Sequence, residues 1–461
     1  MALDFALPMG KMIYELAVTL RGERSVYARL LHLQYLQTQS TEAVCEEQRT
    51  ALVGLLEKNL RRIPYYRDFV EVTIGLTKEN VTERILQLPV LEKEHLQTGA
   101  DQLRVEGWRG GHTTKTTGGS TGRPVTLWKN REAIAQEMAA TWLGYGWFGV
   151  NIGDPCVRFW GQPSNNIRRR LRYLAADTAM RRVTLSAFGY DRSDLHRYVR
   201  RINRHRPTYL YGYVSALSDL ARYLLESGER VDNRLLKCVV TTAEVLSEPQ
   251  RRTIQRAFGV PVQNEYGCGE VGPIAYECPE GSLHLLPTNQ FVEILDPAGL
   301  PVAPGEPGAI VITDLTNEVM PLIRYRVGDT GAFGDACACG RPFPVLASVF
   351  GREYDFVEAP NGKRFHGEFF MYIFEDLRRS NPEIVQFQVV QYTQTSLLVR
   401  VVISADASLP ERAIKEQFGK RLPVFSITVL EVPHIARRPS GKMRIVENQL
   451  MASGDSGESH E

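Results

Sequence analysis

The central part of the chain alternates between two kinds of segment, and this alternation constrains the fold more than any other feature. Runs rich in β-branched and aromatic residues predict strands, and they occupy residues 155–160, 236–241 and 291–295. Apolar residues spaced three and four apart predict helices, which we place at 216–225 and 250–258. Strands that alternate with helices are typical of an α/β domain, and we expect one from about residue 110 to 330.

Two further regions flank this α/β domain. Before it, leucines at helical spacing predict a helical region from residue 12 to about 70, which ends at Pro64 because proline disfavours helix in the residue before it. After Gly351 we expect a small α+β module of ordinary domain size. Its predicted elements are a helix at 368–379, strands at 385–390 and 397–403, a helix at 409–418 and a strand at 427–432.

The predicted fold class is therefore α/β, with a large N-terminal domain of mixed sheets and helices and a small α+β C-terminal domain. We expect the first domain to cover residues 1–351 and the second to cover residues 352–452. Residues 453–461 carry no periodicity and are expected to be a disordered tail.

The composition excludes several classes of function. Of the 461 residues, 43% are hydrophobic and 23% are charged, which is typical of a folded globular chain. With 55 basic and 53 acidic residues the net charge is +2, so no global field attracts nucleic acid or a membrane surface. No run approaches the roughly 18 apolar residues of a membrane span, and Asp4 stands where a signal peptide places positive charge. We expect a cytoplasmic protein, whose seven cysteines form no disulfide framework.

The densest cluster of small and hydroxyl residues is the segment 116–124, with the sequence TTGGSTGRP. Glycines allow a backbone to turn its N–H groups toward an anion, and Ser and Thr hydroxyls add donors, so such a loop can hold a polyphosphate. A flexible surface turn is the alternative interpretation. No Gly-Lys-Ser/Thr follows, so the segment is not the phosphate loop of a P-loop NTPase.

Three later segments favour a functional interpretation of that loop. Residues 264–270, NEYGCGE, place a glycine-bounded tyrosine four residues before a carboxylate. Residues 321–329 end an apolar run with Gly328 and Asp329. Residues 438–442, RPSGK, place Lys442 on a glycine-containing loop of the small C-terminal module.

With these segments in this order, the chain resembles the adenylate-forming (ANL) enzymes. It is similar in particular to the phenylacetate–coenzyme A ligase branch, which includes capsule-associated and coenzyme F-390 synthetase-like proteins. The resemblance runs from about residue 50 to 450 and also covers Thr242-Ala243-Glu244 and Gly351-Arg352.

This resemblance implies an ATP-dependent acid–thiol ligase. A carboxylate attacks the α-phosphate of ATP to give acyl-AMP, and coenzyme A then takes the acyl group. Two alternatives stay open: a different acceptor (a carrier-protein thiol, an amine, or a hydroxyl that receives AMP itself), and a nucleotide-binding scaffold without catalysis. The implied cofactors are ATP and Mg²⁺, with coenzyme A as co-substrate, and a homodimer is a possible assembly.

The resemblance also assigns residues to the nucleotide. The loop implied to hold the β- and γ-phosphates consists of Thr117, Gly118, Gly119, Ser120, Thr121 and Gly122. The adenine pocket is implied to contain Ala243, Glu244, Asn264, Tyr266 and Gly267. Asp329 would accept hydrogen bonds from the ribose, with Arg352 beside it.

Two residues are implied to act in catalysis. Glu270 would help to hold Mg²⁺, since a hard cation prefers carboxylate and phosphate oxygens. Lys442 would reach the α-phosphate and the substrate carboxylate and stabilise the developing charge. In such enzymes a charged hinge residue follows the Gly-Arg pair by two positions, but here that position is Tyr354, followed by Asp355.

A possible metal site lies outside these motifs. Cys278 and His284 share one short segment, and Cys337 and Cys339 follow about 50 residues later. Three thiols and an imidazole suit tetrahedral zinc, and in this branch the corresponding residues resemble a structural zinc site. Reduced cysteines that pack as small hydrophobes are the alternative.

The acyl pocket is implied to lie between the strand that ends at Trp160 and the segment 264–270. Its expected walls are Trp160, Tyr213, Ala243 and Pro273, with Tyr145 and Trp147 nearby. Aromatic walls suit a planar aromatic or other apolar acid. The expected partners are thus a small carboxylic acid and either coenzyme A or a separate carrier protein, without nucleic acid or membrane.

Overall fold

A computed structural model describes residues 25–117, 125–160, 174–187, 190, 192–352, 356–360, 364–404, 407–436 and 444–450. The chain divides into two compact units. The first comprises Met1–Val327 and Gly331–Val349, and the second comprises Gly328–Thr330 and Phe350–Glu461. The tail expected at 453–461 lies outside the described residues.

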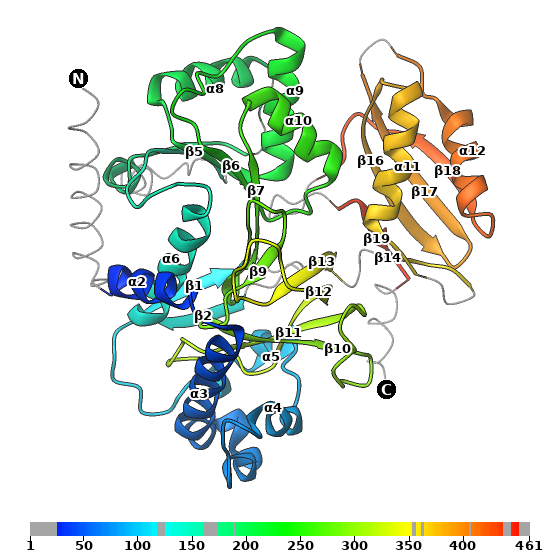
Figure 1. The fold of residues 1–461 in the computed structure, drawn as a ribbon. Coiled ribbons are helices and arrows are strands. Elements are labelled where there is room, and N and C mark those ends of the chain that lie inside the picture. Colours follow the sequence, from blue (N-terminus) through cyan, green and yellow to red (C-terminus); the bar gives the residue numbers. More distant parts are fainter. Residues whose placement is uncertain are drawn as a thin grey trace, which may run out of the picture. The chain divides into compact units, whose positions relative to one another are not determined.

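The first unit is built on a mixed sheet, shown in Figure 1, with the strand order β10-β11-β12-β13-β9-β8-β7-β6-β5-β3-β4. Its parallel half consists of β3 (Cys156–Phe159), β4 (Arg182–Leu185), β5 (Tyr209–Tyr213), β6 (Cys238–Thr242) and β7 (Val262–Cys268). These strands pair in parallel in the order β4-β3-β5-β6-β7. Antiparallel pairing begins where β7 meets β8.

Helices α8 (Arg192–His205), α9 (Val214–Ser227) and α10 (Glu248–Phe258) precede β5, β6 and β7 as crossover connections. Their apolar residues form one core with the strand residues of a single sheet face. On the opposite face, α6 (Arg131–Gly146) and α2 (Val26–Leu36) pack over the sheet. Because both faces are covered, every residue of β6 is buried, as in other parallel sheets.

The antiparallel half begins with a hairpin and continues toward the second edge of the sheet. Its strands are β8 (Gly272–Glu277), β9 (Leu283–Leu285), β10 (Gln290–Leu295), β11 (Gly308–Asp314), β12 (Tyr325–Gly334) and β13 (Val345–Arg352). An antiparallel pair, β1 (His112–Thr117) and β2 (Val125–Asn130), forms a separate small sheet.

The N-terminal region is helical, as predicted, but it consists of short pieces. They are α3 (Thr41–Asn59), α4 (Val81–Arg84) and α5 (Lys93–Thr98), with 3-10 turns at Leu60–Arg62, Pro64–Thr73, Ile85–Gln87 and Ala100–Leu103. Ile63 is extended, with φ −104° and ψ 114°, because the ring of Pro64 disfavours helical dihedrals there. The predicted boundary at Pro64 is therefore correct, although Pro64 also begins a 3-10 segment.

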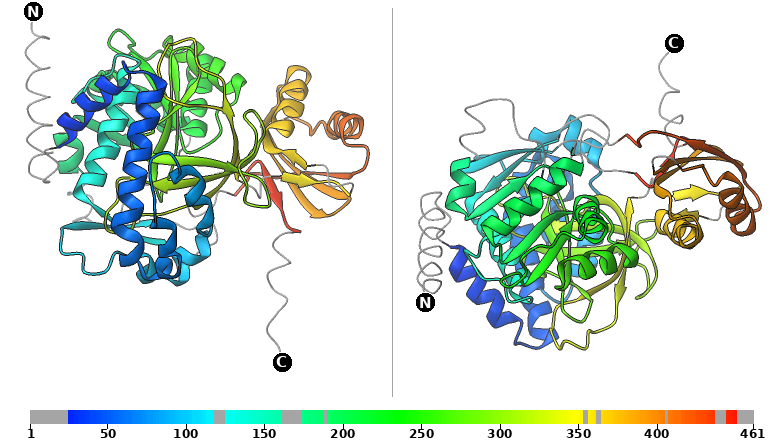
Figure 2. Two further views of the ribbon diagram at one scale, coloured as in Figure 1. Left: turned by 60° about the horizontal axis from the view of Figure 1, so that its bottom comes forward. Right: turned by 90° about the horizontal axis from the view of Figure 1, so that it is seen from above.

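The second unit is an α+β module. It contains β14 (Phe356–Glu358), β15 (Arg364–His366), β16 (Ile384–Thr393), β17 (Ser396–Ile403), β18 (Ser426–Glu431) and β19 (Val446–Asn448), with α11 (Gly367–Ser380) and α12 (Glu411–Arg421). Four of its strands form a sheet in the order β18-β17-β16-β19. Helices α11 and α12 share one apolar core with this sheet, and Figure 2 shows them on the same side of it.

The α/β class and the small α+β module agree with the sequence-based expectation. Each strand and helix predicted between residues 155 and 432 has a counterpart within a few residues of its predicted bounds. In the part of the chain that is described, we find no helix with the length and apolar character needed to cross a membrane.

Candidate active site

The expected nucleotide-binding residues gather at one edge of the parallel half of the sheet. Thr242 ends β6, so Ala243 and Glu244 follow that strand directly, while Asn264 and Tyr266 lie in β7 beside it. The register pairs Thr241 with Asn264, which brings the two segments side by side. In doubly wound sheets the carboxyl ends of parallel strands are where ligands bind.

The turn after β6 is held in a strained conformation. Ala243 has φ 68°, in the left-handed region that residues with a Cβ atom rarely adopt. Such strain costs on the order of 1–3 kcal/mol and is concentrated at functional sites. The carboxylate of Glu244 accepts hydrogen bonds from the backbone N–H (2.6 Å) and the hydroxyl (3.1 Å) of Ser215, in the first turn of α9. Glu244 is thereby fixed at a helix N-terminus, where negative charge is favourable.

A buried carboxylate supports Asn264 from behind. The backbone N–H of Asn264 donates to Glu277 at 2.7 Å, and the hydroxyl of Thr241 lies 3.4 Å from the Asn264 side-chain oxygen. Glu277 also forms a buried ion pair with Arg251 of α10, at 2.8 Å. Burial nevertheless raises the pKa of Glu277, with Arg251 opposing that shift.

The hairpin between β7 and β8 requires glycine at two positions. A Cβ atom on Gly267 would lie 2.7 Å from the backbone oxygen of Gly272 and 3.1 Å from Cα of Pro273. Gly272 itself has φ 89°. This close approach explains the glycine after Tyr266, and it places Pro273 opposite Gly267 in the register.

Glu270 lies in this hairpin and is 7% exposed. The Lys93 ammonium, on the first residue of α5, is 3.4 Å from its carboxylate. The sequence analysis did not identify Lys93, because a single lysine in a charged segment has no distinctive pattern. Tyr266 is half-buried and packs, together with Cys268, against the apolar core beneath the hairpin.

The structure describes only some of the other residues predicted to bind the nucleotide. Thr117 is the last residue of β1, while Gly118, Gly119, Ser120, Thr121 and Gly122 lie outside the described residues. Asp329 is half-buried in β12, after Gly328 with φ 79°. Arg352 ends β13, without a described side chain. Lys442, Tyr354 and Asp355 lie outside the described residues.

The walls expected for the acyl pocket come together in part. The Trp160 ring stacks on Tyr211, with centroids 5.6 Å apart and planes 15° apart, and lies 5.0 Å from the Tyr213 ring. Tyr145, from α6, lies 6.2 Å from Tyr211. Trp147 lies elsewhere, because its ring packs against His284, 5.6 Å away.

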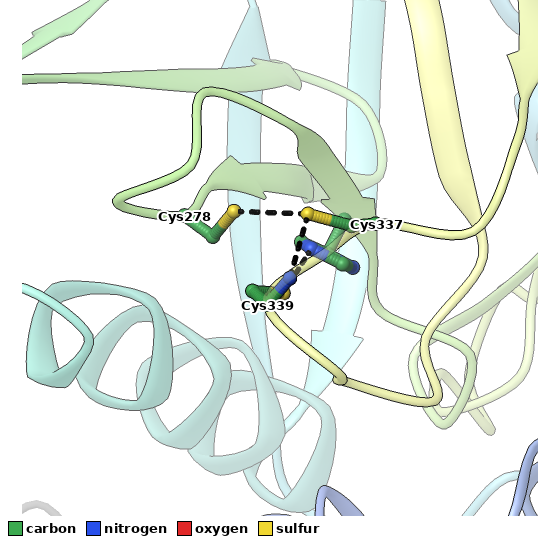
Figure 3. A group of neighbouring side chains, drawn as sticks. Cys278, Cys337 and Cys339 are labelled. Carbon is green, nitrogen blue, oxygen red and sulfur yellow. Dashed lines mark hydrogen bonds between the residues drawn. The ribbon is translucent and has the colours of Figure 1, made fainter.

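The four predicted metal ligands come together in the first unit. Their candidate ligand atoms all lie within 4.8 Å of one another. Figure 3 shows the thiols of Cys278, Cys337 and Cys339 turned toward a common centre. The sulfurs of Cys278 and Cys337 are 3.7 Å apart, and the sulfur of Cys339 is 3.2 Å from Nε2 of His284. Tetrahedral zinc with Zn–S bonds of about 2.3 Å would separate two sulfurs by about 3.8 Å, so the spacing fits.

The surroundings of His284 prepare it as a ligand. Its Nδ1–H donates to the backbone oxygen of Phe343 at 3.1 Å, which leaves the Nε2 lone pair facing Cys339. Burial lowers the pKa of His284 and favours the neutral imidazole that metal binding requires. Trp147 covers the ring, and the guanidinium of Arg341 lies 4.7 Å from the Trp147 ring centroid. Together these contacts hold His284 beside the three thiols, in a group of four candidate ligands of which Cys278 and His284 are buried and Cys337 and Cys339 are half-buried.

Known proteins resemble this chain in sequence and in fold. The family model described as AMP-binding enzyme matches residues 174–320. The protein CapK of Staphylococcus aureus is 22% identical over 395 residues, which cover 84% of this chain and 85% of CapK. A phenylacetate–coenzyme A ligase of Thermus thermophilus is 34% identical over 166 residues, which cover 34% of this chain and 37% of that enzyme.

The fold has solved counterparts. The crystal structure of a 2-hydroxyisobutyryl-CoA ligase in the postadenylation state has a TM-score of 0.67 at 20% sequence identity, covering 88% of this chain and 90% of the ligase chain. In its AMP-binding match, its sequence relatives and its fold, the chain is similar to adenylate-forming (ANL) enzymes, and in particular to phenylacetate–coenzyme A ligases.

Proposed function

We propose that this protein is an AMP-forming acid–thiol ligase, which activates a carboxylic acid with ATP and transfers the acyl group to coenzyme A. The observation that carries the proposal is the meeting of Ala243, Glu244, Asn264 and Tyr266 at the adjacent ends of β6 and β7. These are residues that the family resemblance implies for the adenine pocket. The AMP-binding family match includes all four of them.

The nucleotide would bind with its adenine against the half-buried ring of Tyr266. The strained turn at Ala243 would present backbone groups to the base, since Glu244 is fixed by Ser215 and cannot turn freely. Asp329 would accept hydrogen bonds from the ribose, with Arg352 beside it. The segment from Thr117 to Gly122 would bind the β- and γ-phosphates through backbone N–H and hydroxyl groups.

Glu270 would hold Mg²⁺, because its carboxylate is a hard oxygen ligand at the edge of the nucleotide site. The ion, when bound, would neutralise charge on the phosphates. Lys93 now faces Glu270 at 3.4 Å, and we propose that its ammonium also serves the phosphates when ATP is present. The pair would keep a buried carboxylate compensated while the nucleotide is absent.

The first step forms a bond between a substrate carboxylate oxygen and the α-phosphorus, and pyrophosphate leaves. Lys442 would stabilise the negative charge that develops on the α-phosphate and the carboxylate. In the second step the coenzyme A sulfur attacks the acyl carbon, AMP leaves and the thiol proton is released. Positioning and charge neutralisation account for such chemistry without a Ser-His-Asp arrangement.

The Cys278, His284, Cys337 and Cys339 cluster would hold a structural zinc ion. The donor set is soft and tetrahedral, and no place is left for a water molecule among four protein ligands. We therefore assign it a role in stabilising the loops after β8 and before β13. The domain division near residue 351, a cytoplasmic location and a homodimer remain proposals from the sequence.

The decisive experiment is ATP–pyrophosphate exchange over a library of aryl, aliphatic and amino acids. Exchange that depends on an added acid supports adenylate formation. Failure of every acid in the library to support exchange would contradict the proposal. Release of AMP is then measured with coenzyme A, a carrier protein, an amine and a hydroxyl acceptor. Coenzyme A is expected to give the fastest release, and another acceptor that exceeds it would replace this part of the proposal.

A further inference from the structure

One acidic residue of the nucleotide-binding segment has no part in the scheme above. Glu265 directly precedes Tyr266 in β7, so the two side chains lie on opposite faces of the sheet. Tyr266 packs against the core beneath the hairpin. Glu265 instead faces Tyr145 of α6, a residue that the resemblance places near the acid substrate.

Hydroxyl groups surround the Glu265 carboxylate. Tyr145 donates to one oxygen at 2.8 Å, and Thr242 and Tyr211 donate to the other at 3.1 and 3.3 Å. The hydroxyl of Tyr276 also interacts with this carboxylate, and hydroxyl donors favour its ionised form. Burial is the largest influence on its pKa, which it raises, and the hydroxyls oppose that change.

A cation is missing from these surroundings in the part of the chain that the structure describes. The contacts of Glu265 there are with hydroxyl groups, without an ion pair to lysine or arginine. Arg158 lies on β3, which β6 and β5 separate from β7, and its guanidinium donates to Thr184 at 3.4 Å and lies 5.8 Å from the Trp160 ring centroid. A buried carboxylate without a cation is costly, so this arrangement points to a ligand that supplies one.

Aromatic rings complete the surroundings. Tyr145 and Tyr211 have ring centroids 6.2 Å apart, and Trp160 stacks on Tyr211 and lies 5.0 Å from Tyr213. Aromatic faces beside a carboxylate attract ammonium groups, through cation–π interactions in addition to the charge pair. Glu265 also keeps some solvent-accessible surface, unlike a carboxylate enclosed in the core.

We propose that the carboxylic acid substrate carries a protonated amino group, and that Glu265 binds this group inside the acyl pocket. The inference rests on the proposed ligase function and names the substrate class for it. It replaces the expectation of a purely apolar aromatic acid, because burying an apolar side chain against the Glu265 carboxylate would remove water from the charge without replacing it. Glu265 is thus a specificity-determining residue.

The test compares acids of nearly the same size and shape that differ in one group. One set is phenylalanine, phenyllactate and phenylpropionate, and a second is 5-aminopentanoate, 5-hydroxypentanoate and hexanoate. In ATP–pyrophosphate exchange, the ammonium member of at least one set is expected to have a kcat/KM about 30-fold or more above its neutral partners, the range for a buried charge pair. Equal or higher values for the neutral acids in both sets would overturn the inference.

The Glu265→Gln variant separates this preference from general damage. It is expected to lose the 30-fold preference, which is measured as the ratio of kcat/KM for the ammonium acid to kcat/KM for its neutral partners, so that a general loss of activity cancels. Glu226→Gln, at an exposed position on α9, is the matched control and should keep the preference. If Glu265→Gln does not fold, Glu265→Asp retains the charge and should keep a reduced preference. An unchanged preference in Glu265→Gln would overturn the assignment.

A binding measurement distinguishes failure of this inference from failure of the ligase proposal. Calorimetry with benzylammonium and 5-aminopentanoate needs no turnover. Binding to wild type that is lost in Glu265→Gln supports the ammonium site even if no acid supports exchange, in which case only the ligase proposal fails. Exchange with neutral acids together with no ammonium binding would leave the ligase proposal intact and overturn this inference.

Discussion

The two ends of strand β8 carry two polar sites of opposite character. Just before its first residue, Gly272, the hairpin holds Glu270, whose carboxylate faces the ammonium of Lys93. After its last residue, Glu277, the chain enters the cluster of Cys278 and its three companions. Hard oxygens and an ammonium lie at the first end, and soft sulfurs and an imidazole at the second.

The two groups of polar side chains can therefore be distinguished by the chemistry of their neighbours. The candidate ligand atoms of Cys278, His284, Cys337 and Cys339 all lie within 4.8 Å of one another, and a metal ion with four protein ligands has no open position for a substrate. At the first end the Lys93 ammonium faces Glu270, while Glu244 and Asn264 of the proposed nucleotide site are held by Ser215 and Glu277. Damage at the first end should therefore affect catalysis, and damage at the second should affect stability.

The largest effect is expected for Glu270→Gln. Loss of the negative charge that would hold Mg²⁺ should lower kcat for ATP–pyrophosphate exchange about 100- to 1,000-fold, the range for an electrostatic catalytic group. The melting temperature should change little, and calorimetry of unfolding checks this. A variant with a lower melting temperature and unchanged exchange would show that Glu270 stabilises the fold rather than acts in catalysis.

The second largest effect is expected for Cys337→Ser. Loss of one of four ligands should remove about one zinc ion per chain and lower the free energy of unfolding by about 3 kcal/mol. Metal analysis and thermal unfolding measure both quantities, with Cys45→Ser of α3 as the control. Exchange activity of the folded fraction should persist; its loss with stability unchanged would contradict a structural role.

The substitution Gly267→Ala tests the pairing of β7 with β8, the strand whose two ends are compared. Its Cβ atom would meet the Gly272 oxygen at 2.7 Å, so we expect a loss of about 1–3 kcal/mol of stability. Because Tyr266 is adjacent, KM for ATP should also rise. Gly54→Ala in α3, where a Cβ atom meets nothing within 4 Å, is the control. Unchanged stability would show that the backbone at Gly272 can move away from the added Cβ atom at little cost.

The smallest effect is expected for Arg341→Leu. Removing the guanidinium that lies over the Trp147 ring should cost about 0.5–1 kcal/mol. Zinc content should remain near one per chain, since Arg341 is not a ligand. Thermal unfolding measures the change, and loss of metal in this variant would mean that the cover over His284 is part of the site.

Several features could be predicted from the sequence because the signal is local. The sequence predicted a strand at 236–241 and a helix at 250–258, and the structure has them at Cys238–Thr242 and Glu248–Phe258. Cys278, His284, Cys337 and Cys339 could be grouped because soft ligands of one chemical class are rare in this chain. The tertiary structure brings these four together, although 55 residues separate His284 from Cys339.

Other features could not be predicted because the signal is not local. Nothing in the sequence pairs Lys93 with Glu270, and Trp147 was expected beside the acyl pocket although it covers His284. Glu265 could not be singled out, because one glutamate beside the motif tyrosine Tyr266 has no distinctive pattern. Alternation along a strand indicates that the two face opposite ways, but not what each one meets.

The sequence by itself determined the α/β class, the motifs that resemble those of adenylate-forming enzymes, and which cysteines and histidine are candidate metal ligands. Each of these depends on residue type and on spacing along the chain, which are fixed before folding. Only the tertiary structure decided that the Glu265 carboxylate lies among Tyr145, Tyr211 and Thr242. The electrostatic environment of a side chain depends on residues brought near it by packing, and these come from strands and helices far apart in the chain.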